Sequence, residues 1–122
     1  MHELGLIVDA VDMVEKIAAE QQIARVKKVV VDVGELYMII PTLMQSVYRS
    51  AIKGTRLEGS ELELNEIEAL ADCTSCGKAF NPLHEDGVCP HCGESEYTVK
   101  SGKEFEIRQI GVYDERTDTS LP

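Results

Sequence analysis

The sequence predicts an α+β fold in which two helices pack on a three-stranded sheet, with a small cysteine-rich domain inserted before the last strand. Two stretches carry apolar residues at helical spacing, and they are interleaved with stretches in which apolar and polar residues alternate. All four cysteines of the 122-residue chain lie between Cys73 and Cys92. The Gly, Pro and polar content of this segment differs from both flanks, which indicates a separate insert.

The first helix is predicted over residues 4–22. Apolar side chains recur there at helical spacing, and polar side chains occupy the opposite face. The face expected to be buried consists of Leu4, Ile7, Val8, Val11, Val14 and Ala18. Because this helix begins almost at residue 1, we expect the first residues to be held close to folded structure.

A strand and a second helix follow. Residues 26–33 are rich in valine, which favours a strand that ends at Gly34. Pro41 suits the first turn of a helix that runs to about Lys53, and Gly54 suits its end. The expected buried face of this helix consists of Leu43, Met44, Val47 and Ala51.

Two further strands, over residues 61–70 and 104–112, flank the cysteine segment. The alternation of apolar residues changes phase within each of them, which predicts a bulge or bend in both. The expected domains are therefore a discontinuous α/β domain over 1–70 and 101–115, an insert over 71–100 and a flexible tail over 116–122. The order of the strands in the sheet cannot be predicted from this pattern.

The net charge of −10 argues against nucleic acid as a partner, because an acidic surface repels phosphate backbones. The sequence contains no apolar run near the roughly 20 residues that a membrane-spanning helix needs. It also shows no secretory signal, so we expect a cytoplasmic protein that has no membrane partner.

The cysteines form two C-x-x-C pairs, and a glycine follows each pair. A two-residue gap lets one tight turn direct both thiolates at one ion, and glycine permits the positive φ that such turns often need. In a reducing compartment this pattern favours a metal site over disulfides. A closed shell of four sulfurs suits a structural Zn(II) and leaves no open position for catalysis. The insert is therefore predicted to be a zinc-ribbon domain with the ligands Cys73, Cys76, Cys89 and Cys92.

The first residues, Met1-His2-Glu3, offer a different metal chemistry. The Met1 amine and the His2 amide nitrogen close a five-membered chelate ring, and the His2 amide and imidazole close a six-membered ring. Three nitrogens in one plane suit square-planar Ni(II) or Cu(II). A fourth donor comes from the Glu3 amide, the Glu3 carboxylate or another imidazole, for which His84 is a better candidate than His91. An exposed histidine at a chain end without a ligand role is the competing interpretation.

These features together resemble the HypA/HybF family of hydrogenase maturation factors. The resemblance rests on Met1-His2-Glu3 at a helix start, Val33-Gly34-Glu35 at a strand end, Pro41, the Glu58-Gly59-Ser60 segment and the four-cysteine ribbon, and it covers residues 1–112. It implies a nickel metallochaperone for the hydrogenase large subunit that cooperates with a HypB-type GTPase, and some members also serve urease. It further implies nickel binding by His2 and the terminal amine, zinc binding by the four cysteines, and a contact role for the Glu3 side chain. Gly5 and Ser46-Val47 depart from the family pattern without touching a proposed ligand.

Two other functions compete with the nickel carrier. One is a zinc-ribbon module that binds a partner protein and carries no second metal. The other is a rubredoxin-like iron redox protein, although rubredoxin cores are rich in aromatic residues and this chain has no Trp and only two Phe. No motif of a hydrolase is present, so we expect a protein that is not an enzyme. Both a monomer and a homodimer fit the sequence.

Overall fold

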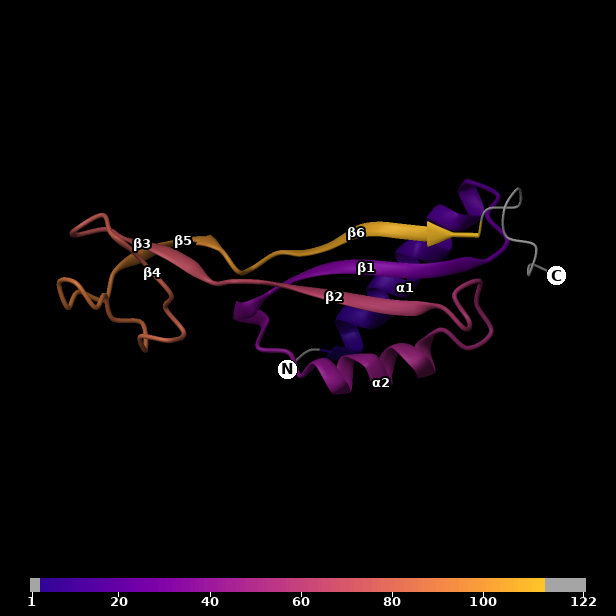
Figure 1. The fold of residues 1–122 in the computed structure, drawn as a ribbon, viewed down its shortest axis with the longest axis horizontal. Helices are drawn as coiled ribbons and strands as arrows, with labels where there is room; N and C mark the ends of the chain where they lie inside the picture. The colour runs from indigo at the N-terminus through magenta and orange to yellow at the C-terminus, as the bar shows by residue number, and fades with distance from the viewer. Residues whose placement is uncertain (1–2, 114–122) are drawn as a thin grey trace. The chain divides into compact units, whose positions relative to one another are not determined.

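The computed structural model describes residues 3–113. Its elements, in chain order, are α1 (Glu3–Glu20), β1 (Val26–Gly34), the 3-10 turn η1 (Glu35–Tyr37), α2 (Pro41–Ala51), β2 (Glu61–Ile67), β3 (Leu70–Cys73), β4 (Ala79–Phe80), β5 (Tyr97–Ser101) and β6 (Phe105–Val112) (Figure 1). The strands form two three-stranded sheets, in the orders β2-β1-β6 and β4-β3-β5. The predicted fold class is confirmed. Neither described helix is both long enough and apolar enough to cross a membrane.

The chain divides into two compact units, and each is built from separate pieces of sequence. The α/β unit contains the described residues of 1–31, 39–64 and 107–122, and the cysteine unit contains 32–38 and 65–106. The structure thus groups the end of β1 and the η1 turn with the cysteine segment. The sequence-based domain boundaries at 70/71 and 100/101 stay a prediction.

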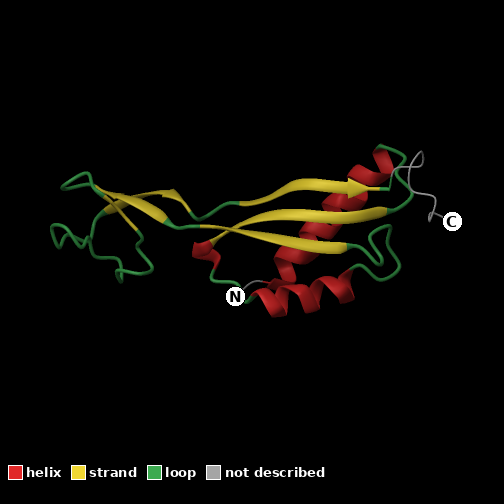
Figure 2. Cartoon of the chain, in the orientation of Figure 1, coloured by secondary structure: helices red, strands yellow, loops and turns green. Residues whose placement is uncertain are grey.

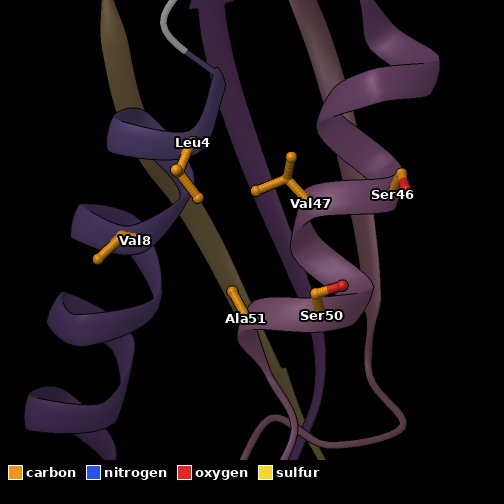
Figure 3. A pocket seen from close by; sticks show the side chains of 6 residues that line it. All are labelled: Leu4, Val8, Ser46, Val47, Ser50 and Ala51. Carbon is orange, nitrogen blue, oxygen red and sulfur yellow. The ribbon is translucent and has the colours of Figure 1, made fainter.

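In the α/β unit, both helices lie on the same face of the sheet (Figures 2 and 3). The fully buried side chains between the layers include Ile7, Val14, Val29, Met44 and Tyr48. The Tyr48 hydroxyl reaches Ser60 Oγ at 2.7 Å, which satisfies the polar end of the largest buried side chain. Helix α2 begins with Pro41 in its first turn, and Gly54, with φ of +78°, follows its end.

The expected buried face of α1 is wrong at two positions. Leu4 and Val8 are 66% and 40% exposed, whereas Ala10 is buried. Together with Val47 and Ala51 of α2, Leu4 and Val8 line an open pocket of about 390 Å³ between the helices (Figure 3). The buried face is turned toward the sheet, so the apolar flank that is next to α2 stays accessible.

The expected buried face of α2 also needs correction. Met44 is buried, Val47 and Ala51 are half-buried, and Leu43 is 45% exposed. Tyr48, which was not among the predicted core residues, is 2% exposed. The buried pair is thus Met44 and Tyr48, at the i, i+4 spacing of one helix face.

The phase change predicted within residues 61–70 marks a break in the strand. Strand β2 ends at Ile67, and β3 begins at Leu70 in the other sheet. Strand β3 is the central strand there, and it pairs antiparallel with β4 and β5. Residues 105–112 form one strand, β6, and the bulge or bend predicted within it stays a prediction.

Candidate metal centre

The four cysteines lie at the ends of two tight turns of the cysteine unit. The N–H groups of Gly77 and Gly93 donate to the carbonyl oxygens of Cys73 and Cys89 at 2.8 and 2.9 Å, which closes each turn. Gly77 and Gly93 have φ of +76° and +81°, the conformation that the sequence pattern predicted for them. The local sequence of each pair therefore folds its own turn.

The two turns face each other and bring four sulfur atoms together. The Sγ atoms of Cys73 and Cys92 are 3.5 Å apart, those of Cys76 and Cys89 are 3.7 Å apart, and all four lie within 4.8 Å of one another. A tetrahedral ion with bonds of about 2.3 Å requires sulfur–sulfur distances of about 3.8 Å. The four cysteines therefore fit one tetrahedral metal ion.

The electrostatics of the thiols also suit a cation. The pKa of Cys73 is lowered to about 7, first because the backbone N–H of Cys76 donates to its sulfur. For Cys92, the N–H of Glu94 lowers the pKa, but the hydrogen bond with Cys73 and burial outweigh it and raise the pKa to about 12. Four neighbouring thiols cannot all ionise alone, and a bound divalent ion supplies the charge that makes four thiolates stable.

The apolar core of this unit is small. The buried cluster here consists of Ala71, Cys73, Phe80 and Cys89, so two of its four members are ligands. Phe80 packs edge-to-face against Tyr97, with ring centroids 5.5 Å apart. Because so little apolar surface is buried, we expect metal binding to supply much of the stability of this unit.

Met1 and His2, which the sequence predicts as nickel ligands, lie outside the described residues. Glu3 is the first residue of α1 and is 5% exposed. Its Oε2 atom accepts a hydrogen bond of 2.7 Å from the N–H of Ile40, in the loop before α2. That bond, followed by one from the N–H of Glu3 itself, lowers the pKa of the carboxyl to about 2. The Glu3 side chain is thus an ionised structural contact at the start of the helix.

His84, the other candidate nickel donor, lies in the loop between the cysteine pairs and contacts Glu35. His84 Nε2 is 3.2 Å from Glu35 Oε2. The second oxygen of Glu35, Oε1, accepts hydrogen bonds from the N–H of Ala69 at 2.8 Å and from Asn81 Nδ2 at 2.9 Å. His91 belongs to the second cysteine turn, where its N–H donates to Cys89 Sγ at 3.4 Å.

Sequence reasoning proposed the four cysteines as zinc ligands and His84 as a candidate nickel donor, and these roles stay predictions. It did not anticipate the hydrogen-bond network that joins Glu35, Asn81 and His84. Glu35 was noted only as part of the Val33-Gly34-Glu35 strand end. Asn81 is 8% exposed, and its Oδ1 accepts hydrogen bonds from the N–H groups of Leu83 and His84. In the sequence, a polar Asn81 directly after the apolar Phe80 could have indicated a buried polar residue that needs a hydrogen-bond partner. It could not have identified Glu35 as that partner.

Comparison with known proteins shows one consistent family. Residues 1–112 match the family described as hydrogenase/urease nickel incorporation, metallochaperone, HypA. The chain is 35% identical over 112 residues to the hydrogenase maturation factor HypA of Chlorobium limicola, covering 92% of this chain and 97% of that protein. It is 36% identical over 112 residues to HypA of Nostoc sp., covering 92% and 96%.

A similar fold occurs in the solution structure of the Ni metallochaperone HypA from Helicobacter pylori. The TM-score is 0.65 at 21% identity, and the match covers 94% of this chain and all of that one. A second solution structure, of a HypA protein, gives a TM-score of 0.66 at 22% identity, covering 93% of this chain and 97% of that chain.

Proposed function

Since this chain belongs to the HypA family of hydrogenase maturation factors, we propose that it is a nickel carrier. It binds Ni(II) through Met1, His2 and Glu3 and delivers it for assembly of the nickel–iron hydrogenase active site. The observation that carries this proposal is the family match, which begins at residue 1 and so includes the Met-His-Glu segment. Nickel is the cargo of the protein, and a Zn(II) ion held by Cys73, Cys76, Cys89 and Cys92 is its structural cofactor.

The proposed nickel donors are the Met1 amine, the His2 amide and the His2 imidazole, with the Glu3 amide as the fourth nitrogen. The position of the Glu3 carboxylate supports this choice, because its Oε2 already accepts the N–H of Ile40. A side chain that is held in this way anchors the first residue of α1, which directly follows Met1 and His2 in the sequence. Glu3 then contributes its backbone to the nickel site and its side chain to positioning.

This binding mode is tested by removing donors one at a time from the zinc-loaded chain. Blocking the Met1 amine breaks the five-membered ring, and His2→Ala removes the six-membered ring. Each change should weaken Ni(II) binding by orders of magnitude in isothermal titration, without changing zinc content or the circular dichroism spectrum.

Asp9→Asn is the control, because Asp9 is an exposed carboxylate on the same helix. It should bind nickel as the unmodified chain does. A zinc-ribbon module without nickel makes the opposite forecast, in which blocking the terminus changes nothing. Full-strength nickel binding by the His2→Ala chain would refute the proposal.

The proposed partners are a HypB-type GTPase and the hydrogenase large subunit, with urease as a further recipient. The net charge of −10 supports an encounter that is steered by charge toward a basic face of the GTPase. Raising the salt concentration should therefore lower the association rate constant more than it raises the dissociation rate constant, as measured by surface plasmon resonance. A salt-independent association rate would contradict electrostatic steering, and the absence of a complex would contradict the partner.

A further inference from the structure

The Glu35–His84 pair is a contact between two metal-binding side chain types outside the four-cysteine site. Glu35 lies in η1, and His84 lies in the loop between β4 and β5, 49 positions further along the chain. Both belong to the cysteine unit. Neither residue is one of the four cysteines that fit a metal ion, so the pair lies outside that site.

The Glu35 side chain and the backbone of His84 are held in place by their neighbours. Glu35 Oε1 is occupied by two donors, the N–H of Ala69 and the amide of Asn81, so its other oxygen, Oε2, is directed at His84. Asn81 also fixes the backbone of His84, whose N–H donates to Asn81 Oδ1 at 3.3 Å. Carboxylates that bind metals are typically oriented by hydrogen bonds of the kind that Glu35 Oε1 accepts.

We propose that Glu35 and His84 form a second divalent-metal site, with Glu35 Oε2 and His84 Nε2 as its two protein ligands and water as the remaining ligands. The class of ion is a first-row divalent ion such as Ni(II), which accepts both imidazole and carboxylate. A site with two protein ligands binds weakly and releases its ion readily.

The geometry of the pair fits a shared ion. Two ligand atoms bound at about 2.0–2.2 Å, at angles between roughly 90° and 109°, are about 2.8–3.6 Å apart. The observed separation of Oε2 and Nε2 is 3.2 Å. A hydrogen bond to the carboxylate requires the imidazole proton on Nε2, whereas metal binding requires it on Nδ1, so that the Nε2 lone pair is free for the ion.

The solvent exposure of the two side chains also suits a metal ion that keeps water ligands. The His84 side chain is 62% exposed, which leaves room for water ligands, whereas the Glu35 side chain is 19% exposed and is held on its inner side. Glu85 and Asp86 follow His84 in the sequence, and their charge raises the local concentration of cations. Substitution of these two carboxylates therefore separates general electrostatic attraction of the cation from its direct binding by Glu35 and His84.

The test uses the full, zinc-loaded chain with His2→Ala, which removes the proposed terminal site. Ni(II) is titrated, and the paramagnetic broadening of backbone amide signals is followed by NMR. We expect saturable broadening centred on Glu35, Ala69, Asn81 and His84. His84→Ala should abolish it, and Glu35→Gln and Asn81→Ala should each weaken binding by about tenfold or more.

Glu35→Gln retains an oxygen that accepts the Ala69 and Asn81 hydrogen bonds, so unchanged amide shifts in the metal-free variant show that the loop stays folded. Glu85→Gln should leave the Ni(II) titration unchanged. Broadening that persists in His84→Ala, that follows Glu85 instead, or that is absent at millimolar Ni(II) would overturn the proposal. This inference can fail independently of the proposed function, because the terminal site is absent from the His2→Ala chain and is tested separately by comparing the unmodified chain with its donor variants.

Discussion

The carboxylate of Glu3 joins the first residue of α1 to the loop that precedes α2. The side chain is buried. Its carboxyl is nevertheless ionised, because the N–H of Ile40 donates to it and keeps its pKa near 2, below the ordinary value of 4.5. A group whose pKa is lower in the folded state stabilises the fold above its ordinary pKa, and this contribution is lost as the pH falls toward the folded value. Glu3 therefore makes the stability of the helix start depend on acidity.

Glu3→Gln should remove this dependence. The variant should be less stable than the parent chain at pH 7, and the difference should shrink between about pH 5 and pH 2 as the parent loses the contribution of its carboxylate. Urea unfolding followed by circular dichroism over that pH range measures the effect. Asp9→Asn, on the exposed face of α1, should reproduce the pH profile of the parent chain. Parallel profiles for Glu3→Gln and the parent would contradict this role.

Residue-level predictions succeeded where chemistry is local. The convergence of the four thiols and the positive φ of the two glycines after them were predicted from spacing alone, and both are observed. Glu35 and Asn81 were missed because their contact spans 46 positions, and no local pattern encodes such a pair. Leu4 and Val8 were assigned to the core because periodicity finds an apolar stripe but does not show which edge of it faces the sheet.

The end of β1 is a place where three backbone segments of the cysteine unit meet. A Cβ atom on Gly34 would lie 2.0 Å from the carbonyl oxygen of Gly102, and a Cβ on Gly102 would lie 2.5 Å from Ala69 Cα. The N–H of Leu36 donates to that same Gly102 oxygen at 2.8 Å. Backbone atoms held by hydrogen bonds cannot move aside, so this crossing has no room for a side chain.

Gly34→Ala should therefore destabilise the protein by about 1–3 kcal/mol, the usual cost of overpacking, although the φ of −70° at this position suits alanine. Gly5→Ala is the matched control. It lies inside α1 with nothing within 4 Å of the added carbon, and it should stabilise the protein by about 0.5–1 kcal/mol through helix propensity. Chemical denaturation measures the free energy of unfolding of both variants. If both substitutions changed it in the same direction, the steric argument would be contradicted.

Helices and strands with a clear periodic spacing of apolar residues were predicted close to their observed bounds. Helix α1 was expected over residues 4–22 and spans Glu3–Glu20, and β1 was expected over 26–33 and spans Val26–Gly34. The short strands β4 and β5 were not predicted. Their pairing with β3 depends on the turns that the cysteines form, and strands of two and five residues carry too little pattern of their own.

At the scale of the whole molecule, the two units differ in what stabilises them. The α/β unit buries aliphatic residues and Tyr48 between helices and sheet, whereas the buried cluster of the cysteine unit has four members, two of them cysteines. Removal of the metal should therefore affect the units unequally.

Treatment with a chelator, or Cys73→Ala, should release about one Zn(II) per chain. Amide hydrogen exchange should then lose protection in β3, β4 and β5, while α1 and α2 keep theirs. Ser75→Ala, an exposed change in the same turn, should retain the metal. Protection of β3 that survives the loss of zinc would show that the metal is not required for this fold.

The grouping of residues 32–38 with residues 65–106 limits how freely the ribbon can be moved between proteins. A genetic cassette that spans only residues 65–106 leaves out Glu35, so the Ala69 N–H and the Asn81 amide lose their acceptor. A transplanted ribbon would need the end of β1 as well, although the two pieces are separated by all of α2 and most of β2. A ribbon moved as a single block into an unrelated protein should therefore fold poorly unless that protein supplies an acceptor in the place of Glu35.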